Sequence, residues 1–134
     1  MTQTDFQPHV LIVEDEEGLR EILEINFGSA GYRVTTAEDG VSAWHAFAAG
    51  HPDLLVLDLN LPRMTGFRLL ELVRSESSVP VLILTAYDFA EAEEIARHRP
   101  DAFMTKPFDV TDLITTADGL IGWRQARKSA GPRR

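Results

Sequence analysis

Several short apolar runs of this chain end in side chains that could take part in chemistry. "VLIV" leads into Glu14 and Asp15, "LLVL" into Asp58, "VLIL" into Thr85 and "AFMT" into Lys106. Each group has a simpler alternative, because the first two acids could cap a helix, the threonine could lie in a turn and the lysine on the surface. Asp58 is harder to explain in this way, since "LNLPRMTG" follows it and no helix begins at once. A carboxylate there is costly to bury unless it is paired.

Together, these residue types favour metal-assisted phosphoryl transfer. Neighbouring carboxylates raise one another's pKa unless a cation lies between them, and Mg²⁺ prefers oxygen ligands. Asp15 and Asp58 could hold the ion, with Glu14 acting through water, and its open positions would face phosphoryl oxygens. Asp58 is the candidate nucleophile, because carboxylates can form aspartyl phosphates. Lys106 would add positive charge and Thr85 a hydroxyl donor, which suits a reaction that depends on positioning and charge neutralisation.

Five apolar runs alternate with five amphipathic runs along the chain. The expected strands cover residues 10–13, 32–37, 54–57, 81–85 and 101–104. The expected helices cover residues 16–31, 41–50, 66–76 and 88–99, and a fifth begins after an Asp109 cap and is weakened in its second half by Gly119. This alternation predicts an α/β fold with a five-stranded parallel sheet and helices on both faces. Ligands of such sheets bind beyond the carboxyl ends of the strands, where all the candidate residues are expected.

Apolar residues at helical spacing identify the helix faces that should pack on the sheet. In chain order, these faces hold Leu19, Ile22, Leu23, Phe27 and Ala30 in the first helix, Val41, Trp44, Phe47 and Ala48 in the second, Phe67, Leu70 and Val73 in the third, and Val110, Leu113, Ile114, Ala117 and Ile121 in the last. The fourth helix has a thinner apolar face. Burial of these residues is therefore a direct test of the predicted helices.

Composition limits the size and the setting of the protein. Its 134 residues fit one domain, which we place at residues 6–127, followed by a basic tail at residues 128–134. The chain holds no cysteine, which excludes a disulfide framework, and its net charge of −8 argues against nucleic acid as the main partner. No apolar run is long enough to cross a membrane and the first residues do not resemble a secretory signal, so we expect a cytoplasmic protein.

The motifs also resemble those of a known family, the receiver domains of two-component response regulators. "VLIVEDEE", "LLVLDLNLPRMTGF", "PVLILTAYD" and "DAFMTKPF" carry the resemblance, which extends over nearly the whole chain. It implies the flavodoxin-like strand order 2-1-3-4-5. It further implies that Asp58 accepts a phosphoryl group from a phosphohistidine of a sensor histidine kinase or a phosphotransfer protein. A downstream protein target would then respond to the change.

The resemblance assigns roles to the residues around the acceptor. Mg²⁺ would bind Asp15, Asp58 and the backbone carbonyl of Asn60, with Glu14 assisting. Lys106 would pair with Asp58 and then with the phosphoryl group.

The resemblance also implies a conformational switch. Thr85 would move inward to bond the phosphoryl group, and Phe103 would rotate into the space that it leaves. Because Phe103 has no hydroxyl, its two states would differ in packing alone. The peptide bond before Pro107 is often cis in the family. We also expect Asn60 and Tyr87 to shield the phosphoryl group partly and to lengthen its lifetime.

Two other classes of protein share parts of this pattern. A phosphatase of the haloacid dehalogenase type wants a second Asp two residues after its nucleophile, where this chain has Asn60, and usually a cap insertion as well. A flavodoxin-like FMN carrier would need a hydroxyl- and glycine-rich loop after the first strand, where this chain has the acidic "EDEEG". We therefore expect a switch that catalyses only its own phosphoryl transfer and slow dephosphorylation, and not an enzyme in the ordinary sense.

Two forms of such a switch remain open. We favour a stand-alone receiver, because few residues follow Trp123. The alternative is the receiver part of a longer regulator whose DNA-binding or enzymatic output domain is absent from this chain. The expected contact surface is formed by the fourth helix, the fifth strand and the fifth helix, where a phosphorylation-dependent homodimer could also form.

Overall fold

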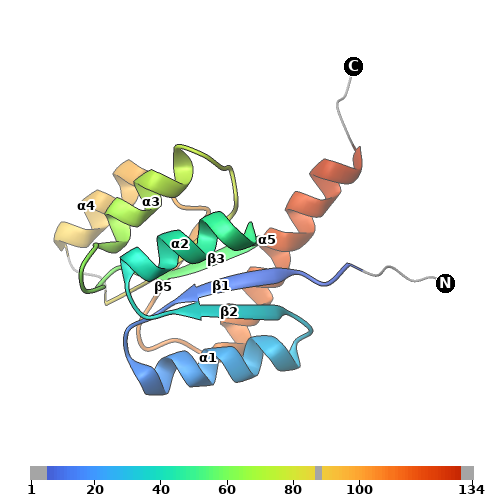
Figure 1. Ribbon diagram of the computed structural model, residues 1–134, viewed down its shortest axis with the longest axis horizontal. Coiled ribbons are helices and arrows are strands. Elements are labelled where there is room, and N and C mark those ends of the chain that lie inside the picture. The colour runs from blue at the N-terminus through green and yellow to red at the C-terminus, as the bar shows by residue number, and fades with distance from the viewer. Residues whose placement is uncertain (1–5, 87–88, 131–134) are drawn as a thin grey trace.

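The computed structural model describes residues 6–86 and 89–130, which form one parallel sheet with helices on both sides (Figure 1). The strands of the sheet are β1 (His9–Val13), β2 (Arg33–Ala37), β3 (Leu54–Asp58), β4 (Val81–Thr85) and β5 (Ala102–Thr105). Their order across the sheet is β2-β1-β3-β4-β5, and every neighbouring pair is parallel. The predicted fold class and strand order are therefore confirmed.

The central strands are apolar because helices cover both of their faces. Every residue of β1, β3 and β4 is buried, whereas the edge strands β2 and β5 are partly exposed. Continuous Leu, Ile and Val runs are typical of strands in such a position. Asp58 is the one acidic residue within these three strands, and it lies at the end of β3.

The helices alternate with the strands along the chain. They are α1 (Glu17–Ser29), α2 (Gly40–Gly50), α3 (Gly66–Arg74), α4 (Phe89–His98) and α5 (Val110–Ala130). All five predicted helices are present, with ends that differ by a few residues. The first ends two residues before the predicted end, because Gly31 has a left-handed backbone with φ of 100° and cannot continue the helix.

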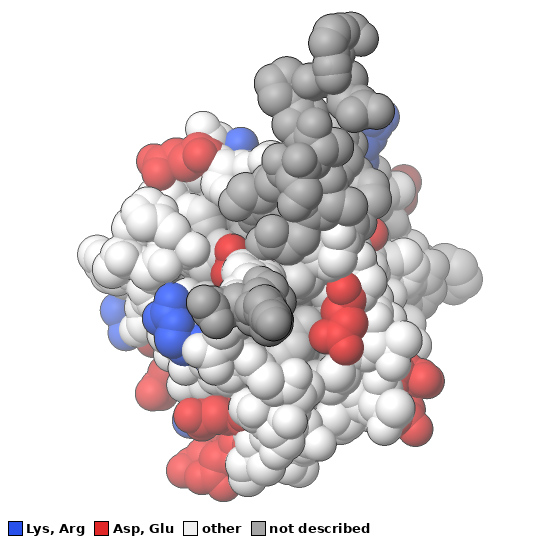
Figure 2. All heavy atoms as spheres, turned by 90° about the vertical axis from the view of Figure 1, so that its right-hand side faces the viewer, with Lys and Arg blue, Asp and Glu red and all other residues white. Residues whose placement is uncertain are grey.

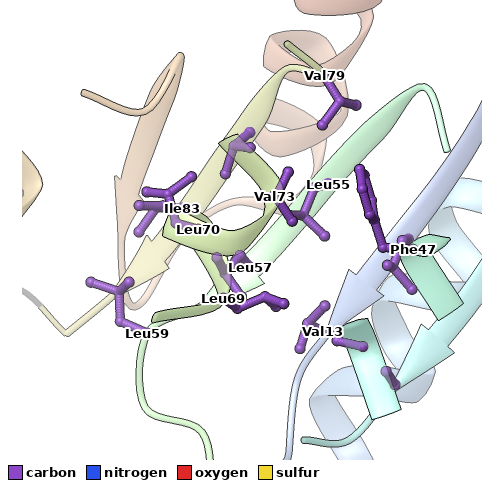
Figure 3. Close-up of a cluster of buried hydrophobic side chains, with 14 of the residues drawn as sticks. Val13, Phe47, Leu55, Leu57, Leu59, Leu69, Leu70, Val73, Val79 and Ile83 are labelled. Carbon is purple, nitrogen blue, oxygen red and sulfur yellow. The ribbon is translucent and has the colours of Figure 1, made fainter. Parts of the chain in front are cut away.

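The helices form two layers, with α1 and α5 on one face of the sheet and α2, α3 and α4 on the other (Figure 1). Leu23 and Phe27 of α1 and Leu113 of α5 belong to one apolar cluster. Side chains of α2 and α3 pack on the opposite face, and Figure 3 shows Phe47 and Leu70 directed toward the strands there. Burial of apolar surface on both faces stabilises the sheet that carries the site.

The predicted buried faces of α1 and α2 were too wide. Ile22 of α1, Ala30 directly after that helix and Ala48 of α2 are exposed, and Ile22 keeps 48% of its accessible surface. Leu23 and Phe27, one turn apart, are fully buried. A helix that lies on a sheet buries a narrow stripe, and Ile22 is turned by about 100° from Leu23 around the helix axis.

The last helix is longer and more regular than expected. Asp109 Oδ1 accepts hydrogen bonds from the backbone N–H groups of Thr111 (2.7 Å) and Asp112 (3.3 Å), as predicted for a cap. The helix then continues through Gly119 without interruption to Ala130, so residues 128–130 of the predicted tail are helical. None of the helices within the described residues is long and apolar enough to span a membrane.

Both ends of the described chain lie on the side where the strands begin. In Figure 1, β1 enters the sheet from that side, and α5 runs back toward it. Figure 2 views the molecule from this side, and its acidic side chains are dispersed over the surface. The carboxyl ends of the strands, where the candidate residues lie, face the opposite way.

Candidate functional site

The parallel register brings the ends of β1, β3, β4 and β5 to one edge of the sheet. Val13 pairs with Leu57, Asp58 with Leu84, and Thr85 with Thr105. The residues at or directly after these positions are Glu14, Asp58, Thr85 and Lys106. The predicted gathering of polar side chains at the carboxyl edge is therefore present.

Three carboxylates form the acidic part of the site. One oxygen from each of Glu14, Asp15 and Asp58 lies within 4.8 Å of the others. Glu14 and Asp58 are buried, with 1% and 3% of their surfaces exposed, whereas Asp15 faces solvent. Asp15 is thus the member of the cluster that is open to solvent.

The backbone around the first two acids is fixed by neighbouring segments. The N–H of Glu14 donates to the carbonyl of Ala37 (3.0 Å), and the N–H of Glu16 donates to Glu14 Oε2 (3.2 Å). The Arg20 guanidinium donates to the carbonyls of Glu14 (2.9 Å) and Asp15 (3.4 Å). The sequence analysis missed Arg20; the available signal was an arginine six and five residues after the two acids.

Lys106 connects the fifth strand to the acids. Its ammonium Nζ donates to Asp58 Oδ2 at 2.9 Å and lies 3.5 Å from Glu14 Oε1. The backbone N–H of Lys106 donates to the carbonyl of Thr85 (2.8 Å), and the bond between Lys106 and Pro107 is cis. One cation thus contacts two buried carboxylates, and the site still has an excess of negative charge.

Burial and the charges within the cluster shift the pKa values of the site. Burial, together with a hydrogen bond to Asp58 and its charge, raises the pKa of Glu14 to about 7. Burial alone would lower the pKa of Lys106, but the hydrogen bond to Asp58 and the charges of Asp58 and Glu14 raise it above its ordinary value. Burial is the largest cause of the shift at Glu14, and the hydrogen bond and charge of Asp58 add to it, whereas the charge of Lys106 acts in the opposite direction.

The donor set fits a hard divalent cation. Mg²⁺ takes oxygen ligands, commonly one or two carboxylates with waters completing the shell, and the three clustered carboxylates supply such oxygens. A bound cation would also favour the ionised form of Glu14. The acidic cluster could therefore bind a metal ion.

The loop after Asp58 is held close to the carboxylate of this residue. The N–H of Asn60 donates to Asp58 Oδ1 (3.0 Å), so both oxygens of this carboxylate have partners. Gly66, at the start of α3, allows the loop to fold back: a Cβ there would lie 2.8 Å from Leu59 Cα and 2.9 Å from the carbonyl oxygen of Asp58. Only glycine fits such a contact with backbone atoms.

The two predicted switch residues lie on the same side of the sheet. Thr85 is buried at the end of β4, and Phe103, which pairs with Ile83, is 44% exposed on β5. Because paired and alternate residues share a face, Thr85 and Phe103 point to the side of the sheet covered by α4. Their movement on phosphorylation stays a prediction. Tyr87, predicted to affect phosphoryl lifetime, lies outside the described residues.

This geometry defines a class: a flavodoxin-like α/β domain with an acidic, lysine-containing site at the carboxyl edge of its sheet. The profile of the family described as "Response regulator receiver domain" matches residues 10–118, so the chain belongs to the response regulator receiver domains. The resemblance inferred from the sequence motifs is thereby confirmed.

Similar proteins support this assignment. The chain is 35% identical over 127 residues to the transcriptional regulatory protein CseB of Streptomyces avermitilis, covering 94% of this chain and 53% of that protein. It is 39% identical over 125 residues to the probable transcriptional regulatory protein TcrX of Mycobacterium tuberculosis, covering 90% and 53%. The chain thus spans about half the length of these curated relatives.

Solved structures give the same result. The receiver domain of the Francisella response regulator 1452 superposes with a TM-score of 0.82 at 29% identity, covering 87% of this chain and 98% of that one. The chemotaxis response regulator CheY4 of Vibrio cholerae superposes with a TM-score of 0.79 at 30% identity, covering 86% and 99%.

Proposed function

We propose that this protein is a phosphorylation-activated switch in a two-component system. Asp58 accepts a phosphoryl group from a phosphohistidine of a histidine kinase or a phosphotransfer protein, and a partner protein responds to the change. The observation that carries the proposal is the buried Asp58 carboxylate, 2.9 Å from Lys106 Nζ and clustered with Glu14 and Asp15. A cytoplasmic location follows as part of the same proposal.

The residues divide the chemistry among them. A carboxylate oxygen of Asp58 attacks phosphorus, the P–N bond of the donor breaks, and the imidazole leaves with the bonding electron pair. Asp15, Asp58 and the Asn60 carbonyl would hold Mg²⁺, with Glu14 assisting through water, and the ion would supply positive charge against the phosphoryl oxygens. Lys106 turns from Asp58 to the transferred phosphoryl group, and the hydroxyl of Thr85 donates a hydrogen bond to that group.

Phosphorylation acts as a signal only if two conformations of the domain bind the new charge differently. In this proposal, Thr85 moves toward the phosphoryl group and Phe103 turns inward behind it. The partly exposed Phe103 side chain is consistent with the unphosphorylated state of such a switch. The responding surface would comprise α4, β5 and α5, where a phosphorylation-dependent homodimer could also form.

The second candidate function is that of a receiver domain within a longer regulator. The curated relatives are transcriptional regulators of about twice this length, which favours a role as the receiver part of a longer regulator over a stand-alone receiver. An antibody raised against this domain distinguishes the two in native cells. A band near 15.0 kDa supports a stand-alone receiver, and a band about twice as heavy supports the longer regulator.

The test of the acceptor uses phosphoramidate, whose P–N bond resembles that of phosphohistidine, with intact-mass spectrometry as the readout. We expect the wild type with Mg²⁺ to gain one phosphoryl group. Asp58→Asn should not gain one, although it keeps the circular dichroism spectrum of the wild type, and chelation of Mg²⁺ should block the gain. The control Asp112→Asn makes the same change at an exposed acid on α5. Labelling of Asp58→Asn at the wild-type rate would show that the nucleophile is another residue.

The same samples test whether the protein is an enzyme. We propose that it does not turn over small phosphomonoesters, since Asn60 stands where a phosphatase of the haloacid dehalogenase type wants its general acid. Sustained release of phosphate from p-nitrophenyl phosphate, abolished by Asp58→Asn, would instead identify a phosphatase. Visible flavin absorbance in the purified protein would identify an FMN carrier.

A further inference from the structure

The loop that carries Asn60 rests against the amino end of α2. This loop, residues 59–65, joins β3 to α3 and holds the backbone carbonyl proposed as a metal ligand. Its first residues are held from the sheet side, by the Leu59 N–H to the Leu84 carbonyl (3.2 Å) and the Asn60 N–H to Asp58 Oδ1 (3.0 Å). The bonds further along are local, from Leu61 N–H to the Leu59 carbonyl (3.2 Å) and from Met64 N–H to the Pro62 carbonyl (2.7 Å). The bonds from the sheet side hold only the start of the loop, so the contacts with α2 determine how its far part, residues 61–64, is placed.

An ion pair makes the first of these contacts. Arg63 Nη1 lies 3.2 Å from Asp39 Oδ2, although Arg63 is a non-glycine residue with a left-handed φ of 71°. That backbone conformation costs about 1 kcal/mol or more and persists only where the surroundings hold it. The pair with Asp39 is a specific contact that offsets this cost.

Asp39 is a well-fixed anchor for the pair. It caps α2, with Oδ1 accepting from the Ser42 N–H (2.7 Å) and Oδ2 from the Ser42 hydroxyl (3.3 Å). Only 8% of its side chain is exposed, against 61% for Arg63. The Ser42 N–H, and to a smaller extent the Arg63 charge, hold the pKa of Asp39 below its ordinary value, so the carboxylate stays ionised.

A close backbone contact lies beside the ion pair. A Cβ on Gly40, the first residue of α2, would lie 2.5 Å from Met64 Cβ and 2.6 Å from the Met64 carbonyl oxygen. Glycine at this position therefore allows the loop to approach α2 more closely than any other residue would. Arg63 and Met64, neighbours in the loop, are thus held by Asp39 and Gly40, neighbours at the helix end.

We propose that the Asp39–Arg63 ion pair positions the Asn60 carbonyl for the divalent cation, so that both residues tune Mg²⁺ affinity without touching the ion. The inference rests on the proposed function, because it assumes a cation at the acidic cluster. Asp39 and Arg63 are positioning residues and not ligands.

The sign of the Arg63 effect separates positioning from simple electrostatics. Arg63→Gln removes a positive charge, so long-range electrostatics alone would strengthen Mg²⁺ binding. If the pair positions the loop, the same change weakens binding. Asp39→Asn keeps a good helix cap and removes only the charge, and both explanations predict weaker binding for it. The double variant has the net charge of the wild type, so electrostatics alone predicts that it binds Mg²⁺ with wild-type affinity. Positioning predicts instead that it binds Mg²⁺ as weakly as either single variant.

The measurement is Mg²⁺ titration by isothermal calorimetry, with the backbone amide shift of Asn60 in NMR spectra as a second readout. An exposed pair of this kind is expected to change affinity about two- to fivefold. We expect that loss in Arg63→Gln, in Asp39→Asn and in the double variant, with a shifted Asn60 amide before Mg²⁺ is added. The control Arg97→Gln removes the same charge from an exposed pair with Glu94 on α4 and should leave the affinity unchanged.

Two results would overturn the inference, and they are distinguishable. If Asp15→Asn loses Mg²⁺ binding but Arg63→Gln binds as tightly as the wild type or more tightly, the positioning role is wrong and the proposed function stands. If the wild type binds no Mg²⁺, or Asp15→Asn binds it equally well, the metal site of the proposed function is wrong and the inference fails with it.

Discussion

Lys106 Nζ lies 2.9 Å from Asp58 Oδ2 and reaches the second buried acid, Glu14, at 3.5 Å. These two carboxylates come from strands that are adjacent in the sheet but distant in the sequence, and the lysine follows the edge strand β5. One ammonium group cannot neutralise two buried carboxylates and their exposed neighbour Asp15. The unbalanced charge of this site is the basis of the first two predictions.

The first prediction concerns stability against pH in the absence of Mg²⁺. The pKa of Glu14 is about 7 in the folded protein, against an ordinary value of 4.5, so folding favours its protonated form. Its contribution is therefore fully present below pH 4.5 and is lost as the pH rises through 7. We expect the wild type to lose about 2 kcal/mol of unfolding free energy across this window relative to Glu14→Gln, after allowance for solvent screening.

Urea denaturation at a series of pH values in EDTA measures this difference. The control Glu21→Gln, at an exposed position of α1, should follow the pH profile of the wild type. Added Mg²⁺ should narrow the gap between the wild type and Glu14→Gln at high pH, because a cation offsets the repulsion. Parallel profiles for the wild type and Glu14→Gln in EDTA would contradict the assigned pKa.

The second prediction isolates the lysine. Lys106→Met keeps much of the side-chain volume and removes the charge that favours the ionised form of Glu14. We expect the pKa of Glu14, followed by NMR through its side-chain carboxyl carbon without Mg²⁺, to rise above its value of about 7 in the wild type. The exposed Arg97→Gln serves as the charge-matched control and should leave this pKa in place. A Glu14 titration that is identical in Lys106→Met would mean that the ammonium group does not act on it.

The third prediction compares two glycines. Gly66→Ala places a methyl group 2.8 Å from Leu59 Cα and 2.9 Å from the Asp58 carbonyl oxygen, and neither backbone atom can move freely. We expect a loss of about 1–3 kcal/mol in unfolding free energy, with weaker Mg²⁺ binding as the loop after Asp58 shifts.

Gly28→Ala is the matched control for Gly66→Ala. A Cβ on Gly28 in α1 would meet nothing within 4 Å, so alanine should stabilise the helix by about 0.5–1 kcal/mol. Urea denaturation and Mg²⁺ titration of the two variants measure both effects. Equal stability changes in the two variants would show that the close contact at Gly66 has no energetic consequence.

The fourth prediction concerns a pair that joins α3 to the start of β5. Arg74 donates to the carbonyl of buried Val79 (2.6 Å) and pairs with Asp101 Oδ2 (2.7 Å), which also accepts from the Val81 N–H (2.8 Å). Arg74→Met would leave the Val79 carbonyl without this partner, and we expect a cost of about 1–2 kcal/mol.

The exposed pair Arg68–Glu71 provides the comparison for this prediction. Arg68→Met should cost less than about 0.5 kcal/mol, because exposed ion pairs contribute little. Urea denaturation of both variants measures the difference. If Arg74→Met were as stable as Arg68→Met, the contact between α3 and β5 would contribute no more than a surface pair.

The sequence predicted the parts of the structure that depend on local pattern. Apolar runs that end in polar residues identified the strands, and a parallel sheet necessarily places the ends of such strands at one edge. Asp58, Thr85 and Lys106 could therefore be grouped from their positions at the strand ends alone. The helices were found by their own periodicity. The exposed Ile22 shows the limit of periodicity as a guide to burial, because hydrophobicity alone does not reveal how narrow a stripe of the helix the sheet covers.

Contacts between distant residues could not be predicted in this way. Arg63 and Asp39 lie 24 residues apart and Arg74 and Asp101 lie 27 apart, and nothing in either local pattern points to the partner. In the structure Asp101 fixes the strand that follows, through its hydrogen bonds with Arg74 and Val81.

The placement of the two chain ends has a practical consequence. Since β1 starts and α5 finishes away from the carboxyl edge of the sheet (Figure 1), anything joined to either end would lie on the side of the domain opposite the acidic site. A biosensor surface or a fluorescent fusion can therefore be coupled at either end, and the acidic site of the immobilised protein would still be accessible to a binding partner.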